Sequence, residues 1–312
     1  MRSAFVDTLF CLAKKDKKIK IVTGDLGFGV LKPFYDDLSE CFINAGIAEQ
    51  NMTSFAAGMA IEGLKPVTYS IGNFPTLRCL EQIRNDICYP NANVKIVCVG
   101  GGYTYGVLGV SHHATEDIGV MRSLPNIIIL SPCDKNEAIS CTKYMMHVNR
   151  PCYLRLGRNG SANFTDDSIL NLPPTINKII DGKDAAIFCT GEIISEAIKA
   201  SCNLRQEHGI SIAVFSCPIL KPFPSKLFLE IISQNHFNTI MTLEEHNVIN
   251  GLGTIVNDCF CFSTNKPKII KLGIDDLLSS AVGNQQYLRQ INSIDSAAII
   301  NEVLKLKNDK HF

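Results

Sequence analysis

The residue with the clearest chemical potential is a glutamate, Glu49, at the start of a predicted helix. The segment 44–52 (Asn-Ala-Gly-Ile-Ala-Glu-Gln-Asn-Met) leaves a predicted strand, turns at Gly46 and enters this helix. Apolar residues then recur at the spacing of one helical face, which predicts that this face packs on the core. Glu49 lies on or beside that face in the first turn, where the helix N-terminus favours negative charge. The predicted apolar face consists of Met52, Phe55, Ala56, Met59 and Ala60.

A carboxylate that faces inward can share a proton with a bound group, because its surroundings shift the balance between its charged and neutral forms. The alternative is an ordinary glutamate of the first helical turn, partly solvated and paired with helix N–H groups. The spacing of residues around Glu49 leaves both interpretations open.

A second candidate is the glycine-rich loop 100–113, which ends in His112 and His113. It follows a predicted strand, and α/β folds bind ligands at the carboxyl ends of their strands. Its glycines do not fit a P-loop or a dinucleotide-binding motif in register, so a nucleotide site is only weakly supported. Two adjacent histidines could bind a metal, but no third ligand lies nearby in the sequence. Acid–base chemistry is the better functional interpretation.

The elements that must position these residues follow a regular order. Between residues 20 and 156, short β-branched segments alternate with helical patterns, one of them a predicted helix at 115–122. This alternation predicts an α/β fold with a mostly parallel sheet that is covered by helices on both faces. The predicted strands are 19–23, 41–44, 65–68, 94–99, 127–130 and 152–156.

A second α/β domain is predicted farther along the chain. Between residues 158 and 187 the alternation gives way to Gly, Ser, Asn and Asp with a Pro-Pro pair, which is typical of a connecting segment. We therefore expect domains at 1–160 and 184–312, joined by a linker at 161–183. The second domain is predicted to contain strands at 185–189, 210–215 and 239–243 and helices at 193–208 and 225–234.

The bulk composition is that of a folded protein with room for two domains. Its 312 residues are 46% hydrophobic, and 30 Lys and Arg balance 30 Asp and Glu, so a nucleic-acid partner is not indicated. A lysine cluster at 14–20 is interpreted as a solvated helix end and the strand that follows it. No apolar run reaches the roughly 18 residues that cross a bilayer, and no secretory pattern follows Met1. A cytoplasmic location is therefore expected.

The thirteen cysteines are expected to be reduced core residues, because they are scattered through apolar segments. No Cys-x-x-Cys motif occurs. Cys259 and Cys261 show strand-like alternation and are expected on one face of a strand, which does not suggest a zinc site. Any metal that the protein uses is expected to be bound elsewhere.

Eight segments together resemble the C-terminal half of transketolases. Each motif alone is moderately specific, but their order and spacing match over nearly the whole chain. The segments are 1–5 (MRSAF), 23–27 (TGDLG), 46–52 (GIAEQNM), 74–84 (FPTLRCLEQIR), 111–117 (SHHATED), 122–126 (RSLPN), 154–158 (LRLGR) and 244–247 (EEHN).

This resemblance implies a split enzyme. Transketolases contain a diphosphate-binding, a pyrimidine-binding and a C-terminal domain, and the resemblance assigns the last two to this chain. The first domain carries a Gly-Asp-Gly motif and a later Asn for Mg²⁺ and the cofactor's diphosphate; the segment 24–26 (Gly-Asp-Leu) is not such a motif. A large partner subunit is therefore implied, which would hold most of the Mg²⁺ site. The natural assembly is an α2β2 heterotetramer, and a heterodimer is the alternative.

The implied activity is that of a transferase, which moves a two-carbon ketol unit between sugar phosphates with thiamine diphosphate as cofactor. Glu49 falls on the glutamate that hydrogen-bonds N1′ of the aminopyrimidine and promotes the tautomer that removes the thiazolium C2 proton. Phe74 matches the aromatic residue on which the aminopyrimidine stacks. Asp25 matches an aspartate that lines the cofactor site.

The resemblance also implies substrate-binding residues. His112 matches the loop histidine that contacts the oxygens of the substrate and is positioned for proton transfer. Arg2 and Arg158 fall on positions that bind the substrate phosphate, where a guanidinium fork suits a pair of phosphate oxygens. Glu49 and His112 are thus the catalytic residues that the resemblance implies.

Three positions depart from the pattern of single-chain transketolases. Leu108 stands where these enzymes have an aspartate four residues before the loop histidine, Gly100 where they have a further histidine, and Gly29 where they have a phosphate-contacting serine. The substrates are therefore open: with fewer polar groups, the site could take a donor or acceptor that is shorter, deoxygenated or differently phosphorylated.

Two other interpretations stay open. The chain could be a β-type subunit of another thiamine-diphosphate enzyme, of the 2-oxoacid dehydrogenase or deoxyxylulose-phosphate synthase type, because both share the glutamate on a helix after a strand. The segments 111–117 and 122–126 weigh against the first type. The chain could also be a non-catalytic binding module, but the joint presence of the four site residues argues against decay; these are Asp25, Glu49, Phe74 and His112.

Overall fold

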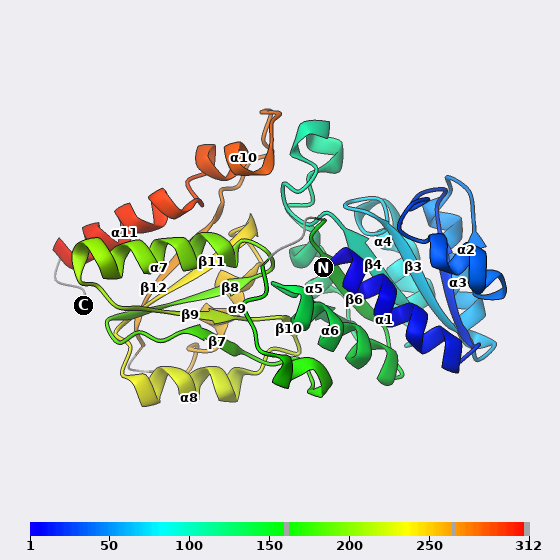
Figure 1. Ribbon diagram of the computed structural model, residues 1–312, viewed down its shortest axis with the longest axis horizontal. Helices are drawn as coiled ribbons and strands as arrows, with labels where there is room; N and C mark the ends of the chain where they lie inside the picture. Colours follow the sequence, from blue (N-terminus) through cyan, green and yellow to red (C-terminus); the bar gives the residue numbers. More distant parts are fainter. Residues whose placement is uncertain (159–161, 264–265, 309–312) are drawn as a thin grey trace.

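Two sheets organise the chain, which the computed structural model describes over residues 1–158, 162–263 and 266–308 (Figure 1). The first sheet has the strand order β10-β5-β6-β4-β3-β1-β2, and all neighbours are parallel except β10, which is antiparallel to β5. Its strands are β1 (Ile19–Thr23), β2 (Phe42–Asn44), β3 (Lys65–Ile71), β4 (Lys95–Val99), β5 (Ile128–Leu130), β6 (Cys152–Leu156) and β10 (Ile219–Lys221).

Helices cover both faces of this sheet, as predicted. Successive residues of a strand point to opposite faces, so Val97 packs with one core while Ile96 and Cys98 pack with the other. One face carries α1 (Arg2–Lys15), α2 (Lys32–Asp37) and α6 (Lys135–His147), and the other carries α3 (Glu49–Ile61), α4 (Leu80–Gln82), the π-helical turn η3 (Ile83–Cys88) and α5 (Asp117–Ser123).

The second sheet has the order β12-β11-β8-β9-β7 and is parallel except for β7, which is antiparallel to β9. In Figure 1, α7 and α11 lie on one side of this sheet and α8 on the other. Its elements are β7 (Asn177–Ile180), β8 (Ala185–Thr190), β9 (Ile212–Ser216), β11 (Thr239–Asn247), β12 (Lys268–Ile274), α7 (Ile194–His208), α8 (Ser225–Asn235), α9 (Leu252–Asp258), α10 (Gln285–Ile291) and α11 (Ser296–Asn308).

The two sheets are less separate than the expected linker at 161–183 suggests. Part of that segment is a strand, β7, which pairs with β9 at the edge of the second sheet. In the other direction, β10 leaves the second half of the chain and pairs with β5 at the edge of the first sheet. One apolar core also runs through both units, since Ile96 and Phe188 belong to the same cluster.

The expectation of a strand at Cys259 and Cys261 was wrong. The chain forms α9 just before them, and both cysteines lie in the turns that follow. The helix begins there because the Glu244 carboxylate accepts hydrogen bonds from the backbone N–H groups of Leu252 and Gly253, at 2.7 and 2.9 Å, which satisfies two donors of its first turn.

All thirteen cysteines are free, and most are buried, as expected for reduced core residues. Cys11, Cys202 and Cys261 are exposed, so these three do not belong to a core. Within the described part of the chain, no helix is both long and apolar enough to cross a membrane.

A buried polar network joins the two units beside the glycine-rich loop. The Arg155 guanidinium donates to the Asp117 carboxylate at 2.8 Å, to the carbonyl of Ala114 at 2.8 Å and to the carbonyl of Glu245 at 3.0 Å. The Glu245 carboxylate in turn accepts from the backbone N–H of Tyr103 at 2.6 Å. Arg155 is on β6 and Glu245 on β11, so this network fixes the loop 100–113 between both sheets.

We predict that Asp117→Asn lowers the free energy of unfolding by about 3–5 kcal/mol, because it leaves the buried Arg155 without its counter-charge. Urea unfolding of the variant checks this. The control is Asp36→Asn, whose partner Lys32 and own side chain are both more than half exposed, so that the expected loss is much smaller. Equal losses in the two variants would contradict the proposed role of the buried pair.

Candidate active site

Five adjacent parallel strands bring the candidate residues to one edge of the first sheet. In the order β6-β4-β3-β1-β2, the carboxyl ends of these strands lead to Arg158, the loop 100–113, Phe74, Asp25 and Glu49. The carboxyl ends of parallel strands lie at the same edge of a sheet, where α/β folds bind ligands. The structure therefore gathers residues that are far apart in the sequence.

Glu49 is the first residue of α3, and its side chain is only 4% exposed. Its carboxylate accepts a hydrogen bond from Arg78 Nη1 at 2.8 Å. The N-cap, Ala48, provides no side-chain cap, so the negative charge lies next to free N–H groups of the helix N-terminus. Gly24 passes close by, and a Cβ atom there would lie 3.6 Å from Glu49 Cγ. Of the two orientations that the sequence left open for this carboxylate, the structure has the inward-facing one.

The apolar face predicted for this helix is correct only in part. Met52, Ala56 and Met59 are buried, but Phe55 is 46% exposed. Thr53 is not part of the predicted apolar pattern, but it is buried. Its hydroxyl donates to the Glu49 carbonyl one turn earlier at 2.8 Å, so the buried polar group is satisfied. The buried face is therefore rotated away from Phe55, which remains at the surface.

Arg78 is the site residue that sequence reasoning missed. Its guanidinium carbon lies 4.3 Å from the centre of the Phe74 ring while Nη1 bonds to Glu49, so one flat cation joins the aromatic ring and the carboxylate. The spacing from Phe74 to Arg78 is four residues. The pair spans turns at residues 72–76 and the start of a short 3-10 helix (Leu77–Cys79), so no helical spacing in the sequence pointed to this contact.

His112 also contacts the Phe74 ring. The two ring centres are 5.1 Å apart in an edge-to-face arrangement, and His112 Nδ1 is 3.0 Å from the hydroxyl of Ser111. Burial, helped by His113 and Arg78, lowers the pKa of His112 below its ordinary value of 6.5. At neutral pH the ring is therefore uncharged and can accept a proton.

The neighbouring histidine has a different place. His113 is buried, its ring lies edge-to-face with Tyr103 at 5.0 Å, and Nε2 is 3.2 Å from the carbonyl of Gly106. It packs the loop against the interior. Of the two histidines, His112 is the one beside Phe74.

Arg2 and Arg158 are both near Tyr105, a residue that the sequence interpretation did not assign to the site. Arg158 lies over the Tyr105 ring at 5.3 Å. Burial raises the pKa of Tyr105, and the charges of Arg158 and Arg2 oppose that rise. A Cβ atom on Gly100 would lie 2.2 Å from the Tyr105 ring. The ring therefore fills the space that a side chain at Gly100, one of the three departures, would need.

Asp25 and the other two departures lie at the exposed rim. Asp25 has a positive φ of 58° and accepts a hydrogen bond from Asn44 Nδ2 at 2.9 Å, while Asn44 also accepts from the Asp25 N–H. This exchange ties the end of β1 to the end of β2. Leu108 is 52% exposed. Apart from the chain neighbours of Gly29, no heavy atom of the described residues lies within 4 Å of a Cβ atom placed on Gly29. The rim thus keeps open space on this side.

The residues present fit an aminopyrimidine ring. The planar guanidinium of Arg78 lies over the Phe74 ring and donates an N–H to Glu49, and an aminopyrimidine is a planar group that could lie over the ring and bond to the carboxylate. Arg78 occupies that position here. Its side chain is 46% exposed, so it has room to turn outward. Among the described residues, no group of three or more His, Cys, Asp or Glu side chains could hold a metal ion.

Comparison with known proteins agrees with the architecture of both units. The protein-family model "Transketolase, pyrimidine binding domain" matches residues 1–162, and "Transketolase, C-terminal domain" matches residues 175–281. A solved structure titled "Split gene transketolase, inactive beta4 tetramer" superposes with a TM-score of 0.85 at 31% identity, over 97% of this chain and 96% of that one.

Related proteins of known name support the same family assignment. A putative transketolase C-terminal section of Methanocaldococcus jannaschii is 31% identical over 98% of this chain and 95% of its own length. One of the apulose-4-phosphate transketolase subunits of Phocaeicola vulgatus is 35% identical over 88% and 87%. A 1-deoxy-D-xylulose-5-phosphate synthase of Aquifex aeolicus is 28% identical over 95% of this chain but only 47% of its own length. The chain therefore belongs to the transketolase family, and it carries the pyrimidine-binding and C-terminal domains of that family.

Proposed function

We propose that this chain is the small subunit of a two-chain transketolase, which transfers a two-carbon ketol unit from a ketose phosphate to an aldose phosphate. One observation carries the proposal: the buried Glu49 carboxylate accepts a hydrogen bond from a planar N–H donor, the Arg78 guanidinium, that lies over the Phe74 ring. A glutamate that only caps a helix gains nothing from burial, since desolvation of a charge is costly. A glutamate that exchanges a proton with a bound ring does gain from it.

Thiamine diphosphate, when bound, supplies the nucleophilic carbon for this chemistry. We assign to Glu49 the hydrogen bond to N1′ of the aminopyrimidine, and to Phe74 the stacking surface beneath that ring. Asp25 lines the rim of the same site. Arg78 must leave the Phe74 face before the ring can stack there, and it then becomes free to meet a negative group at the site.

The substrate side of the proposal rests on the groups around Tyr105. His112 is neutral at pH 7 because its pKa is lowered, so it can take a proton from a substrate hydroxyl and return it to a substrate oxygen. Arg2 and Arg158 provide positive charge within reach of Tyr105. We assign to them the phosphate of the sugar, since guanidinium groups match a pair of phosphate oxygens.

A large partner subunit is part of the proposal, because this chain presents an exposed apolar surface around the candidate site. Phe28, Ile47 and Phe55 are 64%, 78% and 46% exposed, and a partner that closes the site would cover them. That partner would bind the diphosphate and Mg²⁺, in an α2β2 assembly. The solved structure titled "Split gene transketolase, inactive beta4 tetramer" fits this view, since its title calls a tetramer of beta chains inactive.

A deoxyxylulose-phosphate synthase activity is the second candidate. Relatives of that name, from Aquifex aeolicus and Halothermothrix orenii, are 28% and 31% identical over nearly the whole of this chain. The match covers only about half of the length of these two relatives. Turnover with a 2-oxoacid donor instead of a ketose phosphate would favour this candidate.

We predict that Glu49→Gln leaves the fold intact and lowers the turnover number of the reconstituted two-chain enzyme by about 10²–10⁴-fold, because Gln cannot exchange the proton. Ketol transfer is measured after the variant is mixed with a large subunit that carries the Gly-Asp-Gly and Asn motif. Glu62→Gln, at the exposed C-cap of the same helix, is the matched control and should keep normal turnover. Near-normal turnover of Glu49→Gln would refute the assignment.

We also predict that Phe74→Ala weakens cofactor binding by roughly the 0.5–1.5 kcal/mol of an aromatic pair, plus the lost contact area. The dissociation constant of thiamine diphosphate, measured for the two-chain enzyme, checks this. Phe262→Ala removes a fully exposed ring in a turn far along the chain and should change nothing. If Phe74→Ala bound the cofactor as tightly as the unchanged chain, Phe74 would not be the stacking surface.

A further inference from the structure

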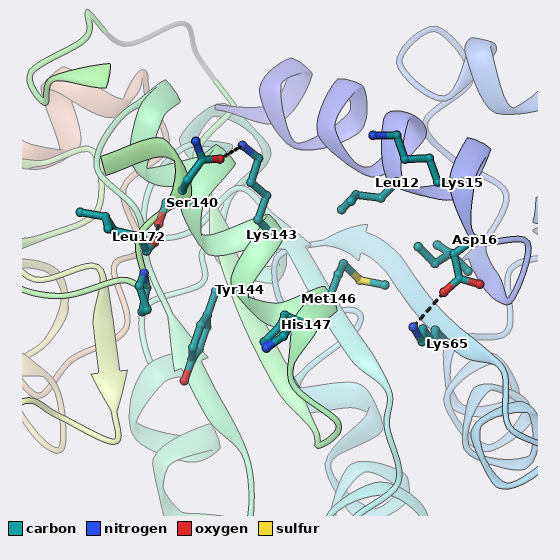
Figure 2. Close-up of a pocket in the computed structure, with 13 residues that line it drawn as sticks. Leu12, Lys15, Asp16, Lys65, Ser140, Lys143, Tyr144, Met146, His147 and Leu172 are labelled. Carbon is teal, nitrogen blue, oxygen red and sulfur yellow. Dashed lines mark hydrogen bonds and ion pairs between the residues drawn. The ribbon is translucent and has the colours of Figure 1, made fainter. Parts of the chain in front are cut away.

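A groove opens on the side of the first sheet that α1 and α6 cover, and the activity proposed above does not use it. It has a volume of about 590 Å³, which lies in the range of small-molecule sites. Figure 2 shows its walls: Leu12 and Lys15 come from α1, and Lys143 and Tyr144 come from α6. Leu172 comes from the end of the 3-10 helix η6 (Asp167–Asn171), which follows β6.

The floor and walls of the groove are mainly apolar. Leu12, Ile19, Met146 and Pro173 line it, together with the ring of Tyr144. Leu172 also lines it and is 56% exposed, so a large apolar side chain faces solvent at its edge. Such a surface gains free energy when an apolar body covers it, by roughly 25 cal/mol for each Å² removed from water.

The charged groups of the groove leave a positive excess. Asp16 is the only acidic residue among the described residues that line it, and its carboxylate is paired with Lys65 at 2.8 Å. Lys143 donates to two neutral oxygens, the carbonyl of Leu170 at 3.1 Å and the side chain of Asn171 at 2.7 Å, so its charge is not neutralised.

Lys15 adds a second uncompensated charge. It makes no hydrogen bond or ion pair within the ranges that the structure describes, and in Figure 2 its side chain extends from α1 toward the α6 side of the groove. Lys143 lies on that facing wall. An exposed cation at the mouth of an apolar groove attracts a negative group at its edge.

We propose that this groove is a binding site for a small amphipathic anion, with an apolar or aromatic body against Leu12, Tyr144 and Leu172 and an acidic group near Lys15 and Lys143. Tight binding needs both the apolar body and the acidic group of the ligand. A bare anion would leave the apolar floor in water, and a neutral apolar molecule would leave the positive charges without a partner.

The groove is distinct from the candidate active site. Ile19 and Lys65 are the first residues of β1 and β3, whereas Asp25 and Phe74 follow the carboxyl ends of these two strands. The groove therefore lies at the opposite edge of the same sheet. A ligand bound there would touch the strands that carry the active-site residues without entering the site itself.

The test is a fluorescence titration of the full chain with 8-anilinonaphthalene-1-sulfonate, an aromatic anion. Lys15→Glu should weaken its binding by roughly tenfold, the order expected when a positive charge near the ligand becomes negative. Leu172→Glu should weaken it at least as much. The matched controls are Lys14→Glu, whose side chain lies over Phe10 on the same helix, and Leu277→Glu, a leucine that is 51% exposed elsewhere. Both should bind like the unchanged chain.

Two further measurements test whether the ligand needs both its apolar body and its charge. The neutral analogue N-phenyl-1-naphthylamine should bind more weakly than the sulfonate, and inorganic phosphate alone should not compete. The groove assignment would be overturned if all four variants bound the dye equally, or if the neutral analogue bound as tightly. It would also be overturned if adding the large subunit abolished binding, because the groove would then be a subunit interface.

Discussion

The buried charge of Glu49 is the constraint on which the candidate site depends. A carboxylate that is 4% exposed must be paired or hydrogen-bonded, because an isolated charge in the interior costs several kcal/mol. In this structure the N-terminus of α3 and one guanidinium meet that need. The guanidinium is held at the same time by the Phe74 ring. One buried charge thus fixes the relative positions of a helix start, an aromatic ring and a cation.

The rest of the fold holds the candidate site residues in their relative positions. Five parallel strands deliver the candidate residues to one edge, and the loop that carries His112 is tied to both sheets through Arg155 and Glu245. Close packing also explains part of the glycine-rich loop. A Cβ on Gly102 would lie 2.5 Å from a Glu245 carboxylate oxygen, so this glycine makes room for the network between the units. The position of His112 therefore depends on both sheets and on the polar network between them.

The sequence predicted the strands and helices that have strong local patterns. The six strands predicted in the first sheet match observed ones to within a few residues, because β-branched and apolar residues mark strands that are buried on both faces. The edge strands β7, β10 and β12 were missed. β7 and β10 are short and antiparallel, and their pairing depends on a distant partner, while Lys268 and Lys271 interrupt the apolar pattern of β12. Helical spacing placed Glu49 on or beside the buried face of its helix but left the direction of its side chain open. Arg78 and Tyr105 were not predicted, because they reach the site only through three-dimensional contacts.

We propose that this chain provides the pyrimidine-activating half of a site whose other half lies on a separate subunit. The most direct measurement is a calorimetric titration of thiamine diphosphate with Mg²⁺ into this chain, into a large subunit with the Gly-Asp-Gly and Asn motif, and into their mixture. We expect tight binding only in the mixture. Tight binding by this chain alone would contradict it, because the diphosphate and metal would then be held by residues of this chain.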